Sequence, residues 1–519
     1  MNKKILCAAV IILALSGLLS FGQGKKELTL TLEDTIARAL KNNLNVAVEV
    51  ISPELAGASL SEAKQYYMPT FQVDYASSRY EQPSTWSLQN TGTYIQNGTN
   101  SDLTVQQQIP FGGNITASLT YQRSKTNQLF QNFNPSYTGN LSFALTQPLL
   151  RNFGWRVSRR QIIVAQNNLD VSRSQFKTTL IETVYSVESA YWNLAYAIEN
   201  LKALRQSLDL GRDLLTKTKK EVEVGQKAPI EVLSVETTVA RREADILQAE
   251  AFVLRYQNQL SILLNLDADP AAKGMAIVPA DKPAFKPSQI TYDEALQKAM
   301  ARRPDLEASR FSIDTRRINF TVAKNQLLPQ LDLKLSKTSP GVSGDRLLYL
   351  NNDPFTGVII GTIPGSMGQA FRDAFKFLYD NWSVGVVLTI PFGDVVGRAN
   401  YAYAKLDLEQ SQARLKNQEQ QISLEVSDAV LTLDTAAKSV EAYRIARELA
   451  EKQLEAEMKK LSVGMSTNYF VLTYQDALAS ARSAELKALV DFNIAQARIA
   501  QVTGSTLEAR NITLSDYIR

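Results

Sequence analysis

The chain has 519 residues and a formal net charge of only +4, so it is long enough for two or three domains and offers nucleic acid no strongly basic surface. It contains no histidine, and its single cysteine is Cys7. Beyond Cys7 the sequence therefore excludes disulfides, Cys/His zinc sites, thiol nucleophiles and Ser-His-Asp triads.

The first 22 residues have the pattern of a secretory signal peptide. Two lysines precede an apolar stretch at residues 5–19, and a small-residue site ends at Gly22. An apolar stretch of roughly 15 residues is short for a membrane span. We therefore expect cleavage before Gln23 and no lipid anchor, because no cysteine follows the cleavage site.

A proline twice separates a helix-like segment from a strand-like one. Residues 63–75, AKQYYMPTFQVDY, change character at Pro69, and residues 323–335, AKNQLLPQLDLKL, change in the same way at Pro329. The alternation of apolar and polar residues after each proline is typical of a strand. The recurrence of this switch along the chain predicts an internal duplication.

The reverse passage, from strand to helix, is also repeated, at Pro148 and at Pro391. We therefore predict three parts: a signal peptide at 1–22, a first structural repeat at 23–289 and a second one at 290–519. Each repeat is expected to contain a helix, membrane strands and a long helical hairpin, and the first repeat also a linker.

Long helices follow the second switch of each repeat. Apolar or small residues recur at steps of three and four from Val187 to Leu215, and the equivalent positions of the second repeat keep the pattern except at Arg447. A period of 3.5 residues predicts helices that pack side by side as a coiled coil. A helix from about Trp155 to Glu221 has roughly 65 residues and a length of about 100 Å, so we expect an elongated architecture.

Each long helix is expected to end at a glycine, in a tight tip at Val224-Gly225 or Val463-Gly464, because glycine easily adopts the positive φ of a helix C-terminus. Pro229 suits the first turn of the helix after the first tip. Ser466 or Thr467 is expected to cap the equivalent helix after the second tip.

Segments of seven to ten residues between the prolines alternate apolar with small or polar residues. They are residues 103–109, 115–123, 139–147 and 381–390. This length and period fit strands that cross an outer membrane, with one face toward lipid and the other toward a wet lumen. A soluble β-sandwich shows the same alternation, but the signal peptide favours the membrane. The polar stretches 81–100 and 341–370 are expected to form surface loops.

One chain supplies four to six such strands, which is too few for a closed barrel. Unpaired backbone groups at an open edge in lipid cost several kcal/mol each. We therefore expect the chain to oligomerise so that its strand edges pair. The hairpin around residue 112 is expected to extend the barrel outward.

In this order and in two copies, these features resemble the TolC-like outer-membrane efflux factors over essentially the whole chain after the signal peptide. The resemblance rests on the Met68-Pro69 and Leu328-Pro329 switches, on TQPL (146–149) and TIPFG (389–393), and on the two Val-Gly tips. It implies a membrane β-barrel that continues into a coiled-coil barrel of long α-helices. The assembly would be a homotrimer with twelve strands in the cell outer membrane and twelve helices across the periplasm, and residues 266–289 would contribute to a belt around the tunnel.

The same resemblance implies a passive exit duct for drug efflux or type I secretion. Its partners would be outer-membrane lipid, a periplasmic adaptor (a membrane fusion protein) that docks at the two tips, and an inner-membrane pump of the RND, ABC or MFS type.

The periplasmic mouth departs from the family pattern. Phe470 and Thr473 stand where the members most similar to TolC carry acids, while Leu461 and Ser466 replace the tyrosine and the arginine of their latch. Glu231 keeps an acid on the first hairpin. We therefore expect Glu231, Phe470 and Thr473 at the mouth, and closure that depends more on the Phe470 ring than on charge.

Two other classes of protein share parts of this pattern. An enzyme is suggested only by acidic pairs such as Asp293-Glu294, and acids at a helix start favour the helix dipole without any catalytic role. No catalytic residue, cofactor or metal is therefore predicted. A periplasmic coiled-coil adaptor is the alternative function, and it would carry a lipoyl-like β-domain in place of ten-residue amphipathic strands.

Overall fold

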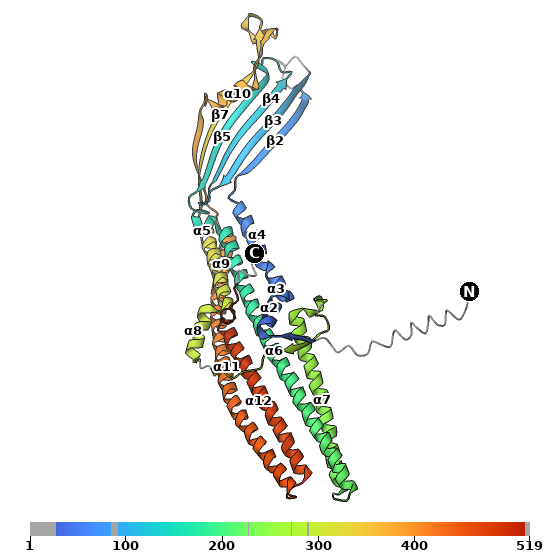
Figure 1. Cartoon of the computed structure of the whole chain (residues 1–519). Helices are drawn as coiled ribbons and strands as arrows, with labels where there is room; N and C mark the ends of the chain where they lie inside the picture. Colours follow the sequence, from blue (N-terminus) through green and yellow to red (C-terminus); the bar gives the residue numbers. More distant parts are fainter. Residues whose placement is uncertain (1–26, 85–91, 227, 271, 288–289, 514–519) are drawn as a thin grey trace, which may run out of the picture. The chain divides into compact units, whose positions relative to one another are not determined.

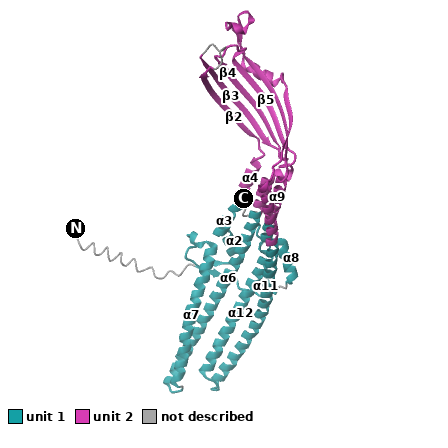
Figure 2. Cartoon of the chain, turned by 180° about the vertical axis from the view of Figure 1, so that it is seen from behind, with its two compact units in different colours: residues 1–54, 171–309, 415–519 teal, residues 55–170, 310–414 magenta. Residues whose placement is uncertain are grey.

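The computed structural model describes residues 27–84, 92–226, 228–270, 272–287 and 290–513 (Figure 1). The predicted signal peptide and its cleavage site lie outside these residues. The chain forms two compact units, of which one is helical and the other contains a large β-sheet (Figure 2). The helical unit comprises residues 1–54, 171–309 and 415–519, and the sheet unit comprises residues 55–170 and 310–414. Each unit takes segments from both halves of the chain, and the division into tandem repeats stays a prediction.

Two long hairpins make up most of the helical unit. Helix α6 (Arg160–Glu223) turns into α7 (Pro229–Leu264), and α11 (Val395–Ser462) turns into α12 (Asn468–Val502). Both α6 and α11 begin in the sheet unit and continue into the helical unit without interruption. Helix α6 has 64 residues, close to the predicted length, but the predicted start at Trp155 lies in a separate short helix, α5 (Trp155–Ser158).

The apolar positions that recur every 3.5 residues are buried along most of the series on α6 and α11. Val187 and Leu194 on α6 are fully buried, and so is Val426 on α11. Toward the second tip the series becomes exposed at Tyr443, where 44% of the residue is accessible. The period thus marks packed helix faces, as a coiled coil requires.

Shorter elements complete the helical unit. They are β1 (Glu27–Leu30), α2 (Leu32–Asn42), α3 (Leu44–Glu49), η1 (Leu266–Ala268), β6 (Ala276–Pro279), α8 (Tyr292–Arg302) and α13 (Thr506–Ala509). Strands β1 and β6 pair in parallel, and the core beneath them is continuous with buried residues of α6 and α7. The Tyr191 hydroxyl donates to Asp281 Oδ2 (2.9 Å) and accepts from the Asp281 N–H (3.1 Å). Burial raises the pKa of this hydroxyl. Asp281, in the segment predicted to contribute to the belt, is therefore fastened to α6.

Four further helices belong wholly or partly to the sheet unit. They are α4 (Ile51–Gln65), α5 (Trp155–Ser158), α9 (Pro304–Gln326) and α10 (Met367–Phe375), with the short helices η2 (Leu350–Asn352) and η3 (Pro354–Thr356) before α10. Within the described ranges, no helix combines the length and the apolarity that crossing a membrane demands.

Six long strands and one short strand form the antiparallel sheet. They are β2 (Thr70–Pro83), β3 (Thr93–Gln108), β4 (Asn114–Thr126), β5 (Phe133–Pro148), β7 (Gln330–Tyr349), β9 (Asn381–Thr389) and the short β8 (Ile359–Ile363). The first five pair in the order β2-β3-β4-β5-β7, and the open side of β7 pairs with β9 along its first part and with β8 along its last part.

Two expectations about this region were wrong. The hairpin β3–β4 does not extend the barrel outward, because it lies within the sheet between β2 and β5. The polar stretches expected as loops are partly strand: residues 93–100 belong to β3 and 341–349 to β7. Ladder hydrogen bonds join backbone groups whatever the side chains, so a polar segment between paired neighbours can remain extended.

Candidate functional site

The four predicted switch prolines lie where strands meet helices. Pro69 stands between α4 and β2, Pro329 between α9 and β7, Pro148 at the last position of β5, and Pro391 shortly after β9. Beside Pro148 and Pro329, the Leu149 N–H donates to the Leu331 carbonyl (2.7 Å) across neighbouring strands. Proline has no N–H and restricts the residue before it to extended conformations, so it suits these passages. We call this the helix end of the sheet.

The two faces of the sheet differ in chemistry. Residues that pair directly across antiparallel strands point to the same face, and successive residues alternate between faces. One row of paired residues consists of Val73, Leu103, Leu119 and Leu141, and the adjacent row on the opposite face consists of Gln72, Thr104, Ser118 and Ser142. The apolar face is largely exposed, as at Val73 (75%) and Val384 (61%). Such a sheet matches a wall with lipid on one side and water on the other.

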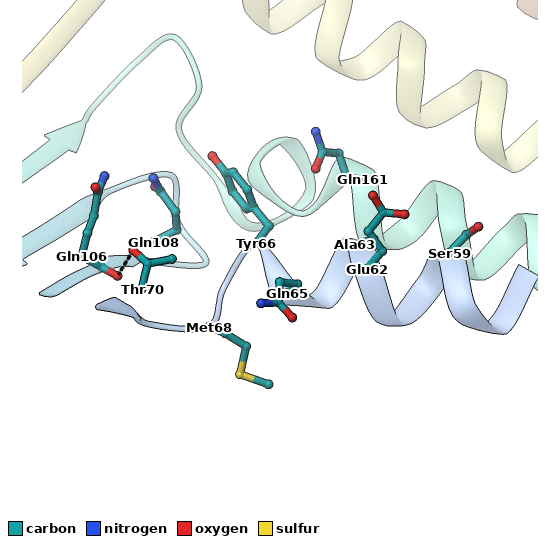
Figure 3. Close-up of a pocket in the computed structure, with 10 residues that line it drawn as sticks. All are labelled: Ser59, Glu62, Ala63, Gln65, Tyr66, Met68, Thr70, Gln106, Gln108 and Gln161. Atoms are coloured by element: carbon teal, nitrogen blue, oxygen red, sulfur yellow. Dashed lines mark hydrogen bonds between the residues drawn. The ribbon is translucent and has the colours of Figure 1, made fainter. Parts of the chain in front are cut away.

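Both lateral edges of the long-strand sheet are open in the described part of the chain. Strand β2 pairs only with β3, and β9 pairs only with β7. Beside the β2 edge lies an open hollow lined by α4, α6 and the ends of β2 and β3 (Figure 3). Its lining is rich in amides, including Gln65, Gln106 and Gln161, and the Thr70 hydroxyl donates to the Gln106 carbonyl (3.3 Å). An open hollow at a free sheet edge, lined by amide groups and by the apolar surface of Ala63, Tyr66 and Met68, suits packing against another protein chain.

The two hairpin tips have the same backbone conformation. Gly225 and Gly464 adopt φ values of 74° and 79°. At the first tip the Gln226 N–H donates to the Glu221 carbonyl (2.8 Å), and at the second the Met465 N–H donates to the Lys460 carbonyl (2.9 Å). These bonds define a Schellman motif, which requires a positive φ that glycine adopts without strain.

Both tips expose apolar side chains. Val224 and Val463 are each 69% exposed, and Met465 is 78% exposed. The predicted cap of α12 was wrong in its chemistry. Thr467 occupies the N-cap position without a capping side-chain bond, and the Ser466 hydroxyl instead donates to Glu457 Oε1 (2.5 Å) on α11. Ser466 thus joins the two arms of the second hairpin.

The predicted mouth residues lie near the starts of α7 and α12. Glu231 is half-buried in the first turn of α7, and Phe470 is 49% exposed in the first turn of α12. The Phe470 ring contacts Tyr469 edge-on with 5.6 Å between centroids, and the Thr473 hydroxyl donates to the Tyr469 carbonyl (2.9 Å). Among the described residues, the structure brings Glu231 and Phe470 into no hydrogen bond or ring contact with each other.

A buried ion pair joins the two hairpins and was missed by the sequence reasoning. Arg242 of α7 has only 4% of its side chain exposed, and its Nε and Nη2 donate to Asp476 Oδ1 of α12 at 3.1 and 2.7 Å. Its Nη1 donates to the Ser207 carbonyl of α6 (2.6 Å), and Arg241 binds the second carboxylate oxygen of Asp476. We call Arg241, Arg242 and Asp476 the inter-hairpin link.

Two further contacts support this link. The buried Asn468 donates through Nδ2 to the Thr218 hydroxyl (3.0 Å), which joins the start of α12 to α6. Farther from the tips, the Ser483 hydroxyl donates to Asn200 Oδ1 (2.6 Å). The first hairpin is thus held to α12 by polar contacts at several levels.

Arg447, the one break in the predicted period, lies inside the second hairpin. Its Nε donates to Glu485 Oε2 of α12 (2.9 Å), and its Nη1 donates to Glu451 Oε2 (3.0 Å). The other carboxylate oxygen of Glu451 accepts from Arg482. Hydrogen bonds from Arg482 and Arg447 lower the pKa of the Glu451 carboxyl. A charge in the seam is tolerated here because it is paired across the hairpin.

Comparison with known proteins supplies the assignment. A family model described as outer membrane efflux protein matches residues 106–266 and 295–505, which together exceed half of the chain. The chain belongs to the outer membrane efflux protein family. The outer membrane efflux protein BepC of Brucella suis biovar 1 (strain 1330) is 22% identical over 526 residues, which cover 99% of this chain and 93% of that protein. Nodulation protein T of Rhizobium leguminosarum bv. trifolii is 22% identical over 77% of this chain and 82% of its own length.

Solved structures show the same fold. The Campylobacter jejuni CmeC outer membrane channel superimposes with a TM-score of 0.63 at 16% identity, covering 96% of each chain. The outer-membrane channel OprN gives a TM-score of 0.64 at 16% identity, over 92% of this chain and 90% of that one. The open-state MtrE channel of Neisseria gonorrhoeae gives 0.60 at 17% identity, over 92% and 89%.

Membership of this family accounts for both units. The sheet unit is the membrane part, and the long helices form the large periplasmic part. The chain is an outer-membrane exit duct of an efflux system, and its family is one of channels rather than enzymes. The adaptor alternative is set aside, since the sheet consists of long amphipathic strands.

The acidic pair considered as a catalytic dyad has a structural role. Glu294 completes a capping box at the start of α8, in which the Thr291 hydroxyl accepts from the Glu294 N–H (3.3 Å) and the Glu294 carboxylate accepts from the Thr291 N–H (3.4 Å). Among the described residues, no group of histidine, cysteine or acidic side chains has the arrangement of a metal site.

Proposed function

We propose that three copies of this chain form the duct and that its membrane barrel has eighteen strands. Each copy contributes six long strands, so three copies contribute 3 × 6 = 18. Strand β2 leads away from the helix end of the sheet and β9 leads back to it. Pairing β9 of one copy with β2 of the next therefore keeps every neighbour antiparallel and removes the open edges that lipid does not tolerate.

An eighteen-stranded barrel is wider than the twelve-stranded one that the resemblance implies. Barrel diameter grows roughly linearly with strand number, so the lumen is about 1.5 times as wide. The polar rows that include Gln72 and Ser142 line it. Passage through such a barrel is passive, and the narrowest point of the route lies at the periplasmic mouth.

Paired cysteines test the strand count and the copy number together. Gln72 on β2 would be replaced by cysteine together with one polar-face position of β9: Ser383, Gly385 or Val387. One of these pairs is expected to form disulfides between copies and to yield a covalent trimer on denaturing gels. Pairs of Gln72 with Val384 or Val386 serve as controls, because these side chains point to the opposite face. Only dimers, or equal cross-linking of both sets, would refute closure through β2 and β9.

The duct works, in this proposal, with a periplasmic adaptor and an inner-membrane pump, and the adaptor docks at Val224-Gly225 and Val463-Gly464. Two observations support docking there: both tips share one rigid backbone motif, and each places a valine with 69% exposure at the end of a long helix. Exposed apolar groups at the end of a hairpin are typical of a protein contact. Either drug efflux or type I secretion uses a duct of this form.

Val224→Glu combined with Val463→Glu tests docking. Valine is preferable to glycine for substitution, because any side chain at the positive φ of Gly225 or Gly464 strains the tip itself. The double variant is expected to abolish export while leaving the trimer in the membrane. Leu210→Glu with Leu449→Glu is the matched control, because these residues are 55% and 54% exposed at mutually equivalent positions of α6 and α11 away from the tips. Normal export by the tip variant would refute docking at the valines.

A further inference from the structure

Helix α10 lies against the apolar face of the sheet. It packs on β5 and β7 (Figure 1), and the Phe371 ring lies 5.9 Å from the ring of Tyr121 on β4. Tyr121 pairs with Gly139, which in turn pairs with Gly341, and these positions belong to the face that carries Leu119 and Leu141. The helix is therefore on the lipid side of the barrel wall, and it does not plug the lumen.

The contact is built from small residues that let the helix approach the strands closely. Ala370 and Ala374 are fully buried against Gly139 and Gly341. A Cβ atom at Gly341 would come within 2.0 Å of the Ala370 carbonyl oxygen. The buried Ser339 hydroxyl donates to the Ala374 carbonyl (2.8 Å), which satisfies a polar group that would otherwise face lipid.

The height of the contact can be worked out along β7. Gly341 is ten residues beyond Leu331, which lies at the helix end. With about 3.3 Å per residue and a tilt of about 40°, ten residues rise about 25 Å, which is the height of the apolar band of outer-membrane barrels. Because the helical unit is periplasmic, α10 lies at the outer boundary of this band.

The segment Met367–Tyr379, which we call the α10 segment, presents apolar side chains away from the sheet. Phe375, Leu378 and Tyr379 are 56–60% exposed, and Phe377 is 40% exposed. Lys337 on the strand beneath holds the end of the segment, with its Nζ 3.4 Å from Asp380 Oδ1 and 5.2 Å from the centre of the Phe377 ring. Lys337 is six residues beyond Leu331, so this end of the segment lies about 15 Å above the helix end, within the apolar band, where exposed apolar side chains meet acyl chains.

Basic residues surround these aromatic side chains. Arg372 and Lys376 are exposed on the α10 segment. Arg79, Arg123 and Lys125 belong to the same face of the sheet, two or four rows of paired residues beyond Tyr121. The neighbouring acids are Asp373, Asp380 paired with Lys337, Glu81 paired with Arg79, and Asp345, which accepts from the Gly365 N–H. The cations still outnumber the acids around the α10 segment.

We propose that the α10 segment and the basic residues of the adjoining strands form a binding surface for anionic lipid of the outer leaflet. The exposed aromatic side chains enter the acyl boundary, and Arg372, Lys376, Arg123 and Lys125 contact headgroup phosphates. The surface continues the lipid-facing side of the sheet, and its charge is complementary to the lipid. The proposal depends on outer-membrane location and on neither the strand count of the trimer nor an adaptor.

A spin label reports whether the segment meets lipid. With Cys7 replaced by serine the chain has no cysteine, so Leu378→Cys carries a single nitroxide. In phosphatidylcholine vesicles this label is expected to collide with oxygen far more than with a water-soluble nickel complex, whereas a label at Ser383→Cys on the polar face collides with nickel. Gly341→Val should dislodge α10 and change the Leu378 signal, and Gly385→Val, with open space around its Cβ, should not. Nickel access equal to that at Ser383, or protection from both reagents by a protein contact, would overturn the proposal.

Charge substitution tests the headgroup contact. We expect the wild-type sheet to unfold at a higher temperature, by circular dichroism, in vesicles that contain phosphatidylglycerol than in phosphatidylcholine alone. This increment should be largely lost in a variant with Arg372, Lys376, Arg123 and Lys125 all changed to glutamine. A control with Lys334, Lys405, Lys416 and Lys438 changed to glutamine removes the same charge elsewhere and should keep the increment. An equal increment in both variants would show that the surface does not recognise anionic lipid.

Discussion

Asp476→Asn is expected to open the periplasmic mouth. The substitution keeps the size of the side chain and removes the charge that Arg242 and Arg241 share between the first hairpin and α12. If the inter-hairpin link holds the closed state, a variant without it should pass ions and solutes more readily than the wild type, while its trimer and its export complex still form.

The magnitude follows from the burial of Arg242. Breaking a buried ion pair from one side costs about 3–5 kcal/mol, because the remaining charge stays buried without its partner. Here the Asp476 side chain is 32% exposed, and Arg242 keeps its bond to the Ser207 carbonyl, so about 2 kcal/mol per copy is a better expectation. A change of about 2 kcal/mol shifts the ratio of closed to open states about 30-fold.

Single-channel recording in planar bilayers measures this shift as open probability and conductance. Asp434→Asn is the control, because Asp434 pairs with Lys438 on its own helix (2.6 Å) and joins no second element. Replacing both Arg242 and Asp476 by leucine should restore closure in part, since apolar residues remove the buried charge as well. Recordings of Asp476→Asn indistinguishable from those of Asp434→Asn would refute the link as a closing device.

Three further outcomes are expected. Phe470→Ala should raise conductance more than Glu231→Ala does, and multivalent cations should block the wild type weakly; tight block that disappears in Glu231→Ala would show that charge governs the mouth. Burial opposes ionisation of Asp305, but bonds from Arg303 and Gln418 outweigh it and lower its pKa. A depressed pKa adds folding stability that is fully present above the ordinary carboxyl pKa of about 3.9 and is lost as pH falls through the lower pKa of the folded state. The unfolding temperature of Asp305→Asn should therefore depend less on acid pH, and an unchanged slope contradicts this. Gly211→Ala should partly reproduce Asp476→Asn, because a Cβ there comes within 2.9 Å of Arg242 Nη1, whereas Gly57→Ala, in open space, should conduct normally.

The local features of this chain were predictable because their causes are local. Pro69 and Pro329 have no N–H to donate to a helix or a ladder and favour an extended residue before them, so each favours a change of element wherever the chain later folds. Gly225 and Gly464 were expected to end helices, and the structure gives both a positive φ. The 3.5-residue period marked the buried faces of α6 and α11, since apolar residues at this spacing form a continuous stripe on one side of a helix that a neighbouring helix must cover.

The sheet was harder to predict because half of its residues face water. Residues 93–100 of β3 are almost entirely polar or small, and their extended conformation depends on pairing with β2 and β4. Helix α10 was missed: only its first four residues fall within the predicted loop 341–370, and nine residues carry too little period to detect. The one available signal for this helix was its pair of small residues, Ala370 and Ala374, four residues apart. They match the small residues Gly139 and Gly341 of distant strands.

The inter-hairpin link could not be predicted from the sequence because the two halves hold no second copy of it, and this asymmetry bears on how the mouth opens. At equivalent positions of the two halves, Ala481 corresponds to Arg242 and Thr237 corresponds to Asp476, so the duplication does not repeat the ion pair. The contact therefore forms once per copy, between α7 of the first hairpin and α12 of the second. The second hairpin is held separately, by Arg447 and Glu485 between its own arms. An opening motion that moves the second hairpin as a unit away from α7 breaks the link and leaves the contacts within that hairpin intact. We therefore expect the α7–α12 contact to be the joint that yields when the mouth opens, because the duplication gives the second hairpin no equivalent of this ion pair.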